Sequence, residues 1–371
     1  MKLFVLLDDL DDSGPLWLNT VAAEMAVLGQ IFDVTLLQVP QPGSEGNTFL
    51  FRARERLGRM AIRKDWVAQV RARHDPKGPN LLLVWAGQGR NLRWADALLP
   101  VWNLFSHRIL NVVDAMRPED VSPERLARFD LIACFCDDLR GLYAQAGPTP
   151  TMFLPPSLDT LRYNSVSDWR PIDLLLVGRR EDRFHAPLMA HYGRGEGQRL
   201  LMDYVSRGQT PQTRAQEMQM LMATYARSSI SFCYEPSANF RFRGLSPMLE
   251  RYVHGWASGC TILGTRPRSA AAAKLMDWPG AMFDMPENPS EAVALIEALL
   301  DDPAGMAARR KRNRREAVAR HDTRLRVAAL LDQLGLAYPQ ALHDALGDHA
   351  TCLADCEAGS ERQFRPDRHM V

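Results

Sequence analysis

The strongest constraint on the fold is a series of short, uninterrupted apolar runs that alternate with longer segments of helical periodicity. Asn80–Ala86 is the run NLLLVWA, and residues 173–177 are the run DLLLV. Strands of a parallel sheet carry such runs because helices cover both faces of the sheet and bury both sets of side chains. The pattern therefore predicts an α/β protein built on parallel sheets.

The predicted elements fall into two successive series. In the first series, strands are expected at residues 2–7, 32–39, 80–86, 109–113 and 130–135, and helices at 16–29, 52–73 and 94–105. In the second series, strands are expected at 173–177, 230–234, 261–264 and 281–284, and helices at 185–192, 197–207, 212–227, 247–258 and 290–300. Each series has the alternation that is typical of a Rossmann-like domain.

A proline-rich and polar segment at residues 154–171 separates the two series, and a length of 371 residues also suits two domains. We therefore expect a first domain at residues 1–155, a linker at 156–170, a second domain at 171–335 and a C-terminal helix with a polar tail at 336–371. In such a pair of domains a ligand lies between them, beyond the carboxyl ends of the strands.

Charge and hydropathy argue against a nucleic-acid-binding protein and a membrane-spanning protein. The formal net charge is +1, whereas a dedicated nucleic-acid-binding protein has a strongly basic face. No stretch approaches the ~20 apolar residues that span a membrane, and the N-terminus leads directly into a predicted strand. The six cysteines lack the grouping of a zinc site and are interpreted as free thiols. We expect a cytoplasmic protein without a nucleic-acid partner.

Residues 241–264 (RFRGLSPMLERYVHGWASGCTILG) carry the clearest signal for a site. Ser246 is predicted to cap a helix at residues 247–258, and Gly259 is predicted to end that helix in a left-handed conformation. The helix also has an apolar stripe that would face the sheet. Capping and packing therefore account for most of this segment.

Capping and packing do not explain the basic residues of the same segment. Arg241 and Arg243 precede the predicted helix, and Arg251 and His254 lie on its polar face. Positive side chains beside the N-terminus of a helix form a favourable site for a diphosphate. A set of solvated surface arginines is the alternative interpretation.

Four pieces of the sequence, taken in order, resemble GT-B glycosyltransferases of the bacterial group-1 (family 4-like) type. They are PPSLDTLRY at 155–163, DLLLVGRR at 173–180, RYVHGWASGC at 251–260, and an arginine-rich helix that ends before His321, Asp322 and Thr323. The resemblance covers roughly residues 150–335. It implies the GT-B architecture, in which two Rossmann-like domains with parallel sheets face each other across a cleft and a helical C-terminus follows.

The resemblance also implies where a nucleotide-sugar donor would bind. The candidate donor-binding residues are Gly178, Arg179, Arg183, Arg241, Arg243, Arg251, Ser258 and Gly259. Fixed cations would stabilise the departing diphosphate, so no metal and no cofactor are expected, and the nucleotide sugar is a substrate. His254 stands where this family often has a glutamate that contacts the donor, and it is a candidate catalytic residue.

The first domain is expected to hold the acceptor. Asp8, Asp9 and Ser13 follow the first strand and are candidate acceptor-side residues. A solvated turn that caps the next helix is the alternative interpretation of this acidic run. Asp114 follows the strand at 109–113 directly and is the second candidate catalytic residue.

These features predict a glycosyltransferase, hexosyltransferase-like, that moves a sugar to a hydroxyl group of a glycan, a lipid-linked molecule or a small molecule. The resemblance favours retention of anomeric configuration and a role in the synthesis of a bacterial surface polysaccharide or glycoconjugate. The missing glutamate keeps open a non-catalytic GT-B-like protein that binds a nucleotide or a glycan.

Two other enzyme classes share the acidic run at residues 9–13. It resembles the start of a phosphohydrolase motif, but the acidic motif expected further along the chain is missing. It also resembles the Asp-x-Asp motif of metal-dependent glycosyltransferases, but that motif lies well inside the chain rather than at residue 9. Both classes are therefore disfavoured.

Residues 307–326 include nine basic side chains. A basic helix of this kind offers a weak contact with anionic lipid at the inner face of the membrane. Its arginines are spread around the helix with little apolar surface opposite them, so a solvated helix that is paired with acidic residues is favoured. The sequence leaves the oligomeric state open.

Overall fold

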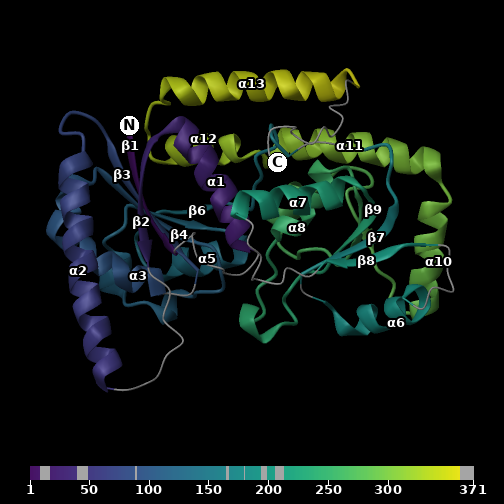
Figure 1. The fold of residues 1–371 in the computed structure, drawn as a ribbon, viewed down its shortest axis with the longest axis horizontal. Coiled ribbons are helices and arrows are strands. Elements are labelled where there is room, and N and C mark those ends of the chain that lie inside the picture. The colour runs from purple at the N-terminus through teal and green to yellow at the C-terminus, as the bar shows by residue number, and fades with distance from the viewer. Residues whose placement is uncertain are drawn as a thin grey trace.

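The chain folds into two parallel sheets, each flanked by helices, in the computed structural model (Figure 1). The structure describes residues 1–8, 17–39, 49–87, 90–163, 167–178, 180–193, 199–204 and 213–359. The predicted architecture of two Rossmann-like halves is confirmed. The two sheets lie at residues 2–153 and 172–284, on either side of the expected linker.

The first half contains a six-stranded sheet with the order β2-β1-β3-β4-β5-β6. Its strands are β1 (Lys2–Asp8), β2 (Asp33–Val39), β3 (Asn80–Ala86), β4 (His107–Val112), β5 (Leu131–Cys134) and β6 (Thr151–Phe153). Its helices are α1 (Trp17–Ile31), α2 (Phe49–Arg73), α3 (Arg90–Ala95), α4 (Pro123–Leu126) and α5 (Asp137–Ala146), with 3₁₀ turns at Asp96–Leu104 and Pro118–Asp120. Every residue of β3 is buried, as its apolar run predicts.

The second half contains a five-stranded sheet with the order β11-β10-β9-β7-β8. Its strands are β7 (Ile172–Val177), β8 (Leu201–Tyr204), β9 (Ser228–Cys233), β10 (Thr261–Gly264) and β11 (Phe283–Asp284). Its helices are α6 (Asp182–Tyr192), α7 (Arg214–Ala226), α8 (Glu250–Ala257), α9 (Ala270–Lys274) and α10 (Pro289–Leu300), with a 3₁₀ turn at Phe240–Phe242.

Three predicted helices differ from the structure. The helix expected at 197–207 is wrong because Leu201–Tyr204 forms the edge strand β8, paired in parallel with β7. Tertiary pairing has overridden the local pattern. The helix expected at 94–105 is largely a 3₁₀ helix that contains Pro100, which cannot donate the hydrogen bond of a regular α-turn. The single helix expected at 307–326 is two helices, as described next.

Asp322 divides the arginine-rich segment into α11 (Pro303–His321) and α12 (Thr323–Gln333). Its backbone is extended, with φ −70° and ψ 140°, and its side chain accepts a hydrogen bond from the Arg324 N–H to cap α12. The cap redirects the chain, and Val327 and Leu331 of α12 then pack in the hydrophobic core of the first half. These two residues belong to the range predicted for the second domain, whose boundary at residue 335 remains a prediction.

The last helix, α13 (Gln340–Glu357), packs on α1, α11 and α12, and lies across the top of both halves in Figure 1.

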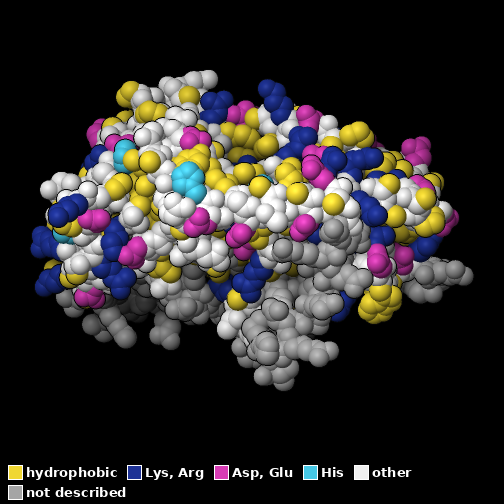
Figure 2. Space-filling view, turned by 90° about the horizontal axis from the view of Figure 1, so that it is seen from above, with side chains coloured by type: hydrophobic (Ala, Val, Ile, Leu, Met, Phe, Trp, Pro, Cys, Tyr) yellow, Lys and Arg dark blue, Asp and Glu magenta, His cyan; other side chains and the backbone are white. Residues whose placement is uncertain are grey.

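The arginines of α11 are largely paired, for example Arg310 with Asp168 at 2.8 Å and Arg320 with Glu316 at 2.7 Å. Figure 2, which looks onto this side of the molecule, shows basic and acidic side chains interspersed. The paired helix agrees with the favoured interpretation, and the membrane contact remains a prediction. None of the helices among the described residues is long and apolar enough to cross a membrane.

The chain crosses between the two halves twice, and the two crossings lie against each other. Leu158 of the linker donates its N–H to the His321 carbonyl at 2.9 Å, and the Thr323 N–H donates to the Leu158 carbonyl at 3.0 Å. These backbone bonds join the PPSLDTLRY segment to the junction of α11 and α12. Two of the pieces that carry the family resemblance therefore form one structural unit.

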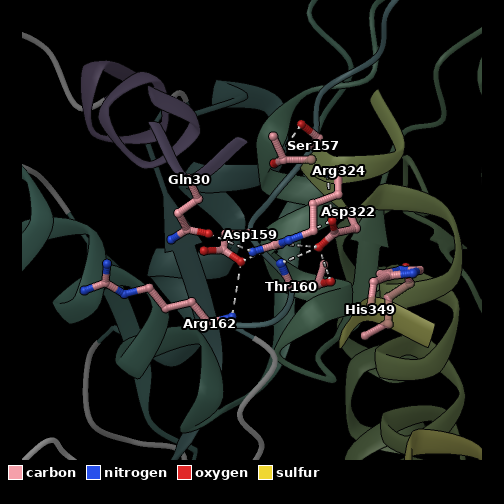
Figure 3. Close-up of polar contacts among 10 residues, drawn as sticks. Gln30, Ser157, Asp159, Thr160, Arg162, Asp322, Arg324 and His349 are labelled. Carbon is pink, nitrogen blue, oxygen red and sulfur yellow. Dashed lines mark hydrogen bonds and ion pairs between the residues drawn. The ribbon is translucent and has the colours of Figure 1, made fainter. Parts of the chain in front are cut away.

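Buried charges reinforce this unit, which we call the hinge cluster: Asp159, Thr160, Asp322 and Arg324 (Figure 3). Arg324 is 3% exposed and donates to Asp159 Oδ1 at 2.9 Å and to both carboxylate oxygens of Asp322. Thr160 donates to Asp322 Oδ2 through its N–H at 3.0 Å and its hydroxyl at 2.6 Å. The cluster holds both crossings in place and thereby positions one half relative to the other.

Candidate active site

A cavity of 640 Å³ lies between the two halves, at the carboxyl ends of strands from both sheets. The first half contributes the polar residues Thr20, Glu24, Asn91, Asn111 and Asp114 together with Trp85. The second half contributes Gly178, Arg241, Glu250, Arg251 and His254. Ser157, Thr323 and Arg326, from the two crossings, complete the lining. The position agrees with the expected location of a ligand between two Rossmann-like domains.

Three of the predicted donor-binding residues line this cavity. Gly178 follows β7 directly and has φ +71°, a conformation that favours glycine and leaves the backbone accessible. The Arg251 guanidinium donates to the Val177 carbonyl at 2.9 Å, which holds its positive charge beside the glycine turn. Arg241 reaches the cavity from the 3₁₀ turn that precedes α8. A glycine turn and two guanidinium groups are therefore close together on one wall.

Arg183, Ser258 and Gly259 do not line the cavity. Arg183 is exposed on α6, stacks over Phe184 at 4.6 Å and pairs with Glu181 at 3.3 Å. Ser258 and Gly259 lie at the carboxyl end of α8, where Gly259 has φ +71° and ends the helix as predicted. Arg179 lies outside the described residues.

Arg241 and Arg243 both pair with acids of the first half. Arg241 Nε donates to Asp114 Oδ2 at 3.1 Å, and Arg241 Nη2 contacts the same oxygen. Arg243 has φ +51° and pairs with Asp120 at 2.6 Å and with Glu119 at 3.2 Å. Of the two arginines, Arg241 lines the cavity and Arg243 lies outside it. The pairs join the two halves across the mouth of the cleft.

The N-terminus of α8 differs from the prediction. The helix begins at Glu250, after Leu249, and Ser246 does not cap it. Instead the Ser246 hydroxyl donates to Glu235 Oε2 at 2.7 Å, and the chain from 246 to 249 is not yet helical. The Glu250 carboxyl group occupies the first turn of the helix, and burial raises its pKa. The positive end of α8 therefore already carries an acid and is not an empty diphosphate site.

His254 lies one turn after Glu250 and is 3% exposed. Burial, and next the charge of Arg251, lower its pKa to about 4. Among the described residues, its Nε2 atom has no hydrogen-bond partner. The imidazole is therefore neutral near pH 7, so it can make one further neutral hydrogen bond but cannot neutralise a phosphate.

Glu24 on α1 is a site residue that sequence reasoning missed. Its Oε1 accepts a hydrogen bond from the Ser157 hydroxyl at 3.2 Å, and the Ser157 and Thr323 hydroxyls are also 3.2 Å apart. Burial, and next the facing charge of Glu250, raise the pKa of Glu24 to about 8. The available signal was that Glu24, at the end of the run NTVAAE, is the only charged residue of the helix predicted at 16–29.

Of the acceptor-side candidates, Asp8 is the last residue of β1, and Asp9 and Ser13 lie outside the described residues. Asp114, by contrast, is 8% exposed and lines the cavity after β4. No group of three or more His, Cys, Asp or Glu side chains in the described part of the chain is placed to hold a metal ion.

Comparison with solved structures identifies the architecture. HepE from Anabaena, crystallised with UDP, matches with a TM-score of 0.54 over 90% of this chain and 100% of that chain, at 12% identity. A glycosyltransferase from Rickettsia africae matches with a TM-score of 0.52 over 92% and 98%, at 10% identity. An α-glucosyltransferase in complex with UDP-glucose and DNA containing an abasic site matches with a TM-score of 0.56 over 90% and 99%, at 10% identity. The chain has the GT-B fold.

At identities of 10–12%, these structural matches establish the GT-B fold alone. The reaction has to be inferred from the residues of the site. No family model and no curated protein sequence matches the chain. In GT-B terms, the cavity is the cleft between the two Rossmann-like halves, and the hinge cluster lies where the chain crosses between them.

Proposed function

We propose that the chain is a glycosyltransferase that moves a sugar from a nucleotide-sugar donor to a hydroxyl acceptor. The observation that carries the proposal is the division of the cleft. Gly178, Arg241 and Arg251 lie on one wall, and Asp114 lies on the other. The structural neighbours support the donor class, because HepE was crystallised with UDP-glucose and the α-glucosyltransferase also holds UDP-glucose.

The Arg241–Asp114 ion pair suggests how the reaction begins. A donor diphosphate at the glycine turn would compete for the Arg241 guanidinium and release Asp114. The bond between the anomeric carbon and the diphosphate oxygen then breaks, and its electron pair leaves with the diphosphate, whose growing charge Arg241 and Arg251 stabilise. The acceptor oxygen bonds to the anomeric carbon from the same face that the diphosphate leaves, so that the configuration is retained, and its proton passes to Asp114.

The finer features follow the sequence resemblance. We propose hexosyl transfer with retention, no requirement for a metal or a cofactor, and a cytoplasmic role in bacterial surface polysaccharide or glycoconjugate synthesis. The alternative is a non-catalytic GT-B-like protein that binds a nucleotide or glycan. The specific observation in its favour is the buried, neutral His254 at the position where the family often has a glutamate.

A nucleotide panel tests the proposal. UDP, GDP, ADP and the corresponding nucleotide sugars are added to the protein with and without EDTA, and the melting temperature is measured. One nucleotide should stabilise the fold in both conditions. The double variant R241A/R243A should raise the donor Kd at least tenfold, which corresponds to a loss of about 1.4 kcal/mol of binding free energy, because the Arg241 guanidinium no longer meets the diphosphate.

The matched control is R310A/R312A, which removes two α11 arginines that contact Asp168 and the Pro279 carbonyl, respectively. Its donor Kd should stay within twofold of the wild type. Release of free sugar from the donor without an acceptor, with binding intact, separates an enzyme from a binding protein. Absence of any nucleotide effect would overturn the proposal, and a shift that needs Mg²⁺ would overturn its metal-independence.

A further inference from the structure

Among the polar, uncharged side chains that the first half contributes to the cleft, three come from β3, α3 and β4 and have been given no role. Trp85 lies at the end of β3, Asn91 in α3 and Asn111 in β4, and all three line the cavity. Their exposed fractions are 9%, 2% and 4%. We call Trp85, Asn91 and Asn111 the amide–indole wall.

Two polar atoms of this wall are unsatisfied. Among the described residues, neither Trp85 Nε1 nor Asn91 Oδ1 has a hydrogen-bond partner. The orientation of the Asn91 amide is fixed, because its Nδ2 donates to the Trp85 carbonyl at 2.7 Å and the reverse orientation would place two oxygens together. A buried polar atom without a partner costs free energy, so native proteins keep few of them, and one that lines a cavity is placed to meet a ligand or a water.

We propose that the amide–indole wall is the acceptor subsite and that it binds a neutral saccharide. This inference rests on the proposed transferase function and specifies its acceptor. An indole N–H needs an acceptor atom and an amide oxygen needs a donor, and a sugar hydroxyl supplies both. The apolar surface of Trp85, with Leu83 and Val113 beside it in the cavity lining, suits the C–H face of a sugar ring.

None of the described residues that the first half contributes to this wall is a cation, which disfavours an anionic acceptor. Its ionisable groups are the acids Glu24 and Asp114. The lining cations Arg241 and Arg251 come from the second half, where Arg241 is paired with Asp114, and Arg326 comes from α12. A purely alkyl acceptor would leave Trp85 Nε1 and Asn91 Oδ1 without partners. A neutral hydroxyl compound therefore satisfies the wall best.

The subsite also has room and a suitable position. Asn111 lies near the end of β4 and Asp114 lies two residues beyond that end, so a hydroxyl held by the wall lies on the side of the cleft where Asp114 can take its proton. An open pocket of 620 Å³ adjoins the cavity and shares Gly87, Asp114 and Arg241 with it. A saccharide longer than one ring can extend into this pocket.

The test is the variant W85F, which keeps the aromatic ring and removes the N–H. Transfer from UDP-glucose, or from the nucleotide sugar that stabilises the protein most, is measured as diphosphate release with glucose, mannose and maltose. We expect the acceptor KM to rise about fivefold, the effect of one lost hydrogen bond, with the donor Kd and donor hydrolysis unchanged. N111V should raise the acceptor KM in the same way.

The matched control is W102F, because Trp102 packs against Phe105 and Phe129 and does not line the cavity. Its acceptor KM should equal that of the wild type. Saturation-transfer NMR of maltose with the UDP-bound protein gives a second readout that does not require turnover. The signal should weaken in W85F and persist in W102F.

The outcomes separate this inference from the proposed function. If a nucleotide binds but only glucose 6-phosphate or octanol serves as acceptor, the saccharide assignment is wrong and the transferase function stands. An unchanged acceptor KM and NMR signal in W85F would also overturn the assignment. If no nucleotide binds, the transferase function fails.

Discussion

The two walls of the cleft differ in charge, although the two halves share one architecture. The wall of the second half presents the glycine turn at Gly178 with the guanidinium groups of Arg241 and Arg251. The wall of the first half presents Asp114 and the uncharged amide–indole wall. The fold therefore sets where ligands meet, and a few side chains at the strand ends determine which ligand each half receives.

One pair of residues departs from this division. Glu24 and Glu250 face the same cavity from opposite halves, and burial is the main cause that raises the pKa of both. A carboxyl group that stays protonated adds no negative charge beside the donor. The contrast between the walls near pH 7 therefore depends on how these two acids titrate.

Asp114 gives the largest expected effect on the difference between the two walls. Changing Asp114 to Asn removes the proton acceptor of the first wall, and we expect kcat to fall about 10²–10⁴-fold, the usual contribution of a general base. Because the variant also removes the charged partner of Arg241, the donor Kd should stay constant or decrease. Steady-state kinetics and calorimetric titration measure the two effects separately. A drop of less than tenfold in kcat would exclude Asp114 as the base.

A change in the hinge cluster tests whether both walls depend on how the two halves are positioned relative to each other. Changing Arg324 to Met leaves Asp159 and Asp322 buried without their cation, which should cost about 3–5 kcal/mol of folding stability. Chemical denaturation measures this loss, and donor and acceptor binding should weaken together. The control is R162M, because Arg162 lies over the Tyr163 ring at the surface, 5.3 Å from its centroid. Equal stability of the two variants would argue against the cluster as a structural hinge.

The sequence predicted the sheets well because their signal is local. The uninterrupted apolar run at 80–86 indicates a strand with two buried faces, and the structure contains β3 there. The glycine at 259 likewise ends α8 with the expected positive φ. Strand β8 was predicted as a helix, because its identity comes from pairing with β7 and its own four residues carry no alternation.

The site was predicted only in part, because some of its features arise from tertiary contacts. Gly178, Arg241 and Arg251 could be placed in one site because the family motifs that contain them mark strand ends and helix starts. Trp85 was interpreted as one apolar residue of a strand, since nothing in NLLLVWA indicates that its indole N–H lacks a partner. The Arg241–Asp114 pair links residues 127 positions apart, which no single-chain periodicity could show.

The smallest expected effect is on the pH dependence of folding stability, and it comes from Glu24. It shows how much negative charge the first wall carries. The folded pKa of Glu24, about 8, lies above its unfolded value of 4.5, so the stability that Glu24 contributes is fully present below pH 4.5 and is lost as the pH rises to 8. His254 and His321 have lowered pKa values of about 4 and about 3, so their contributions are lost only as the pH falls below 6.5. Measurements above pH 6.5 therefore exclude these two histidines, and the comparison with E24Q separates Glu24 from Glu250.

Between pH 6.5 and 8.5 the wild type should lose up to about 2 kcal/mol of stability relative to E24Q, which cannot titrate at this position. The measurement is the unfolding free energy from urea titrations at several pH values. E287Q, which alters an exposed acid, should follow the wild type. Parallel curves for the wild type and E24Q would mean that Glu24 is already ionised at pH 6.5. In that case the first wall would carry a second negative charge, and the division between an acid wall and a basic wall would be stronger than proposed.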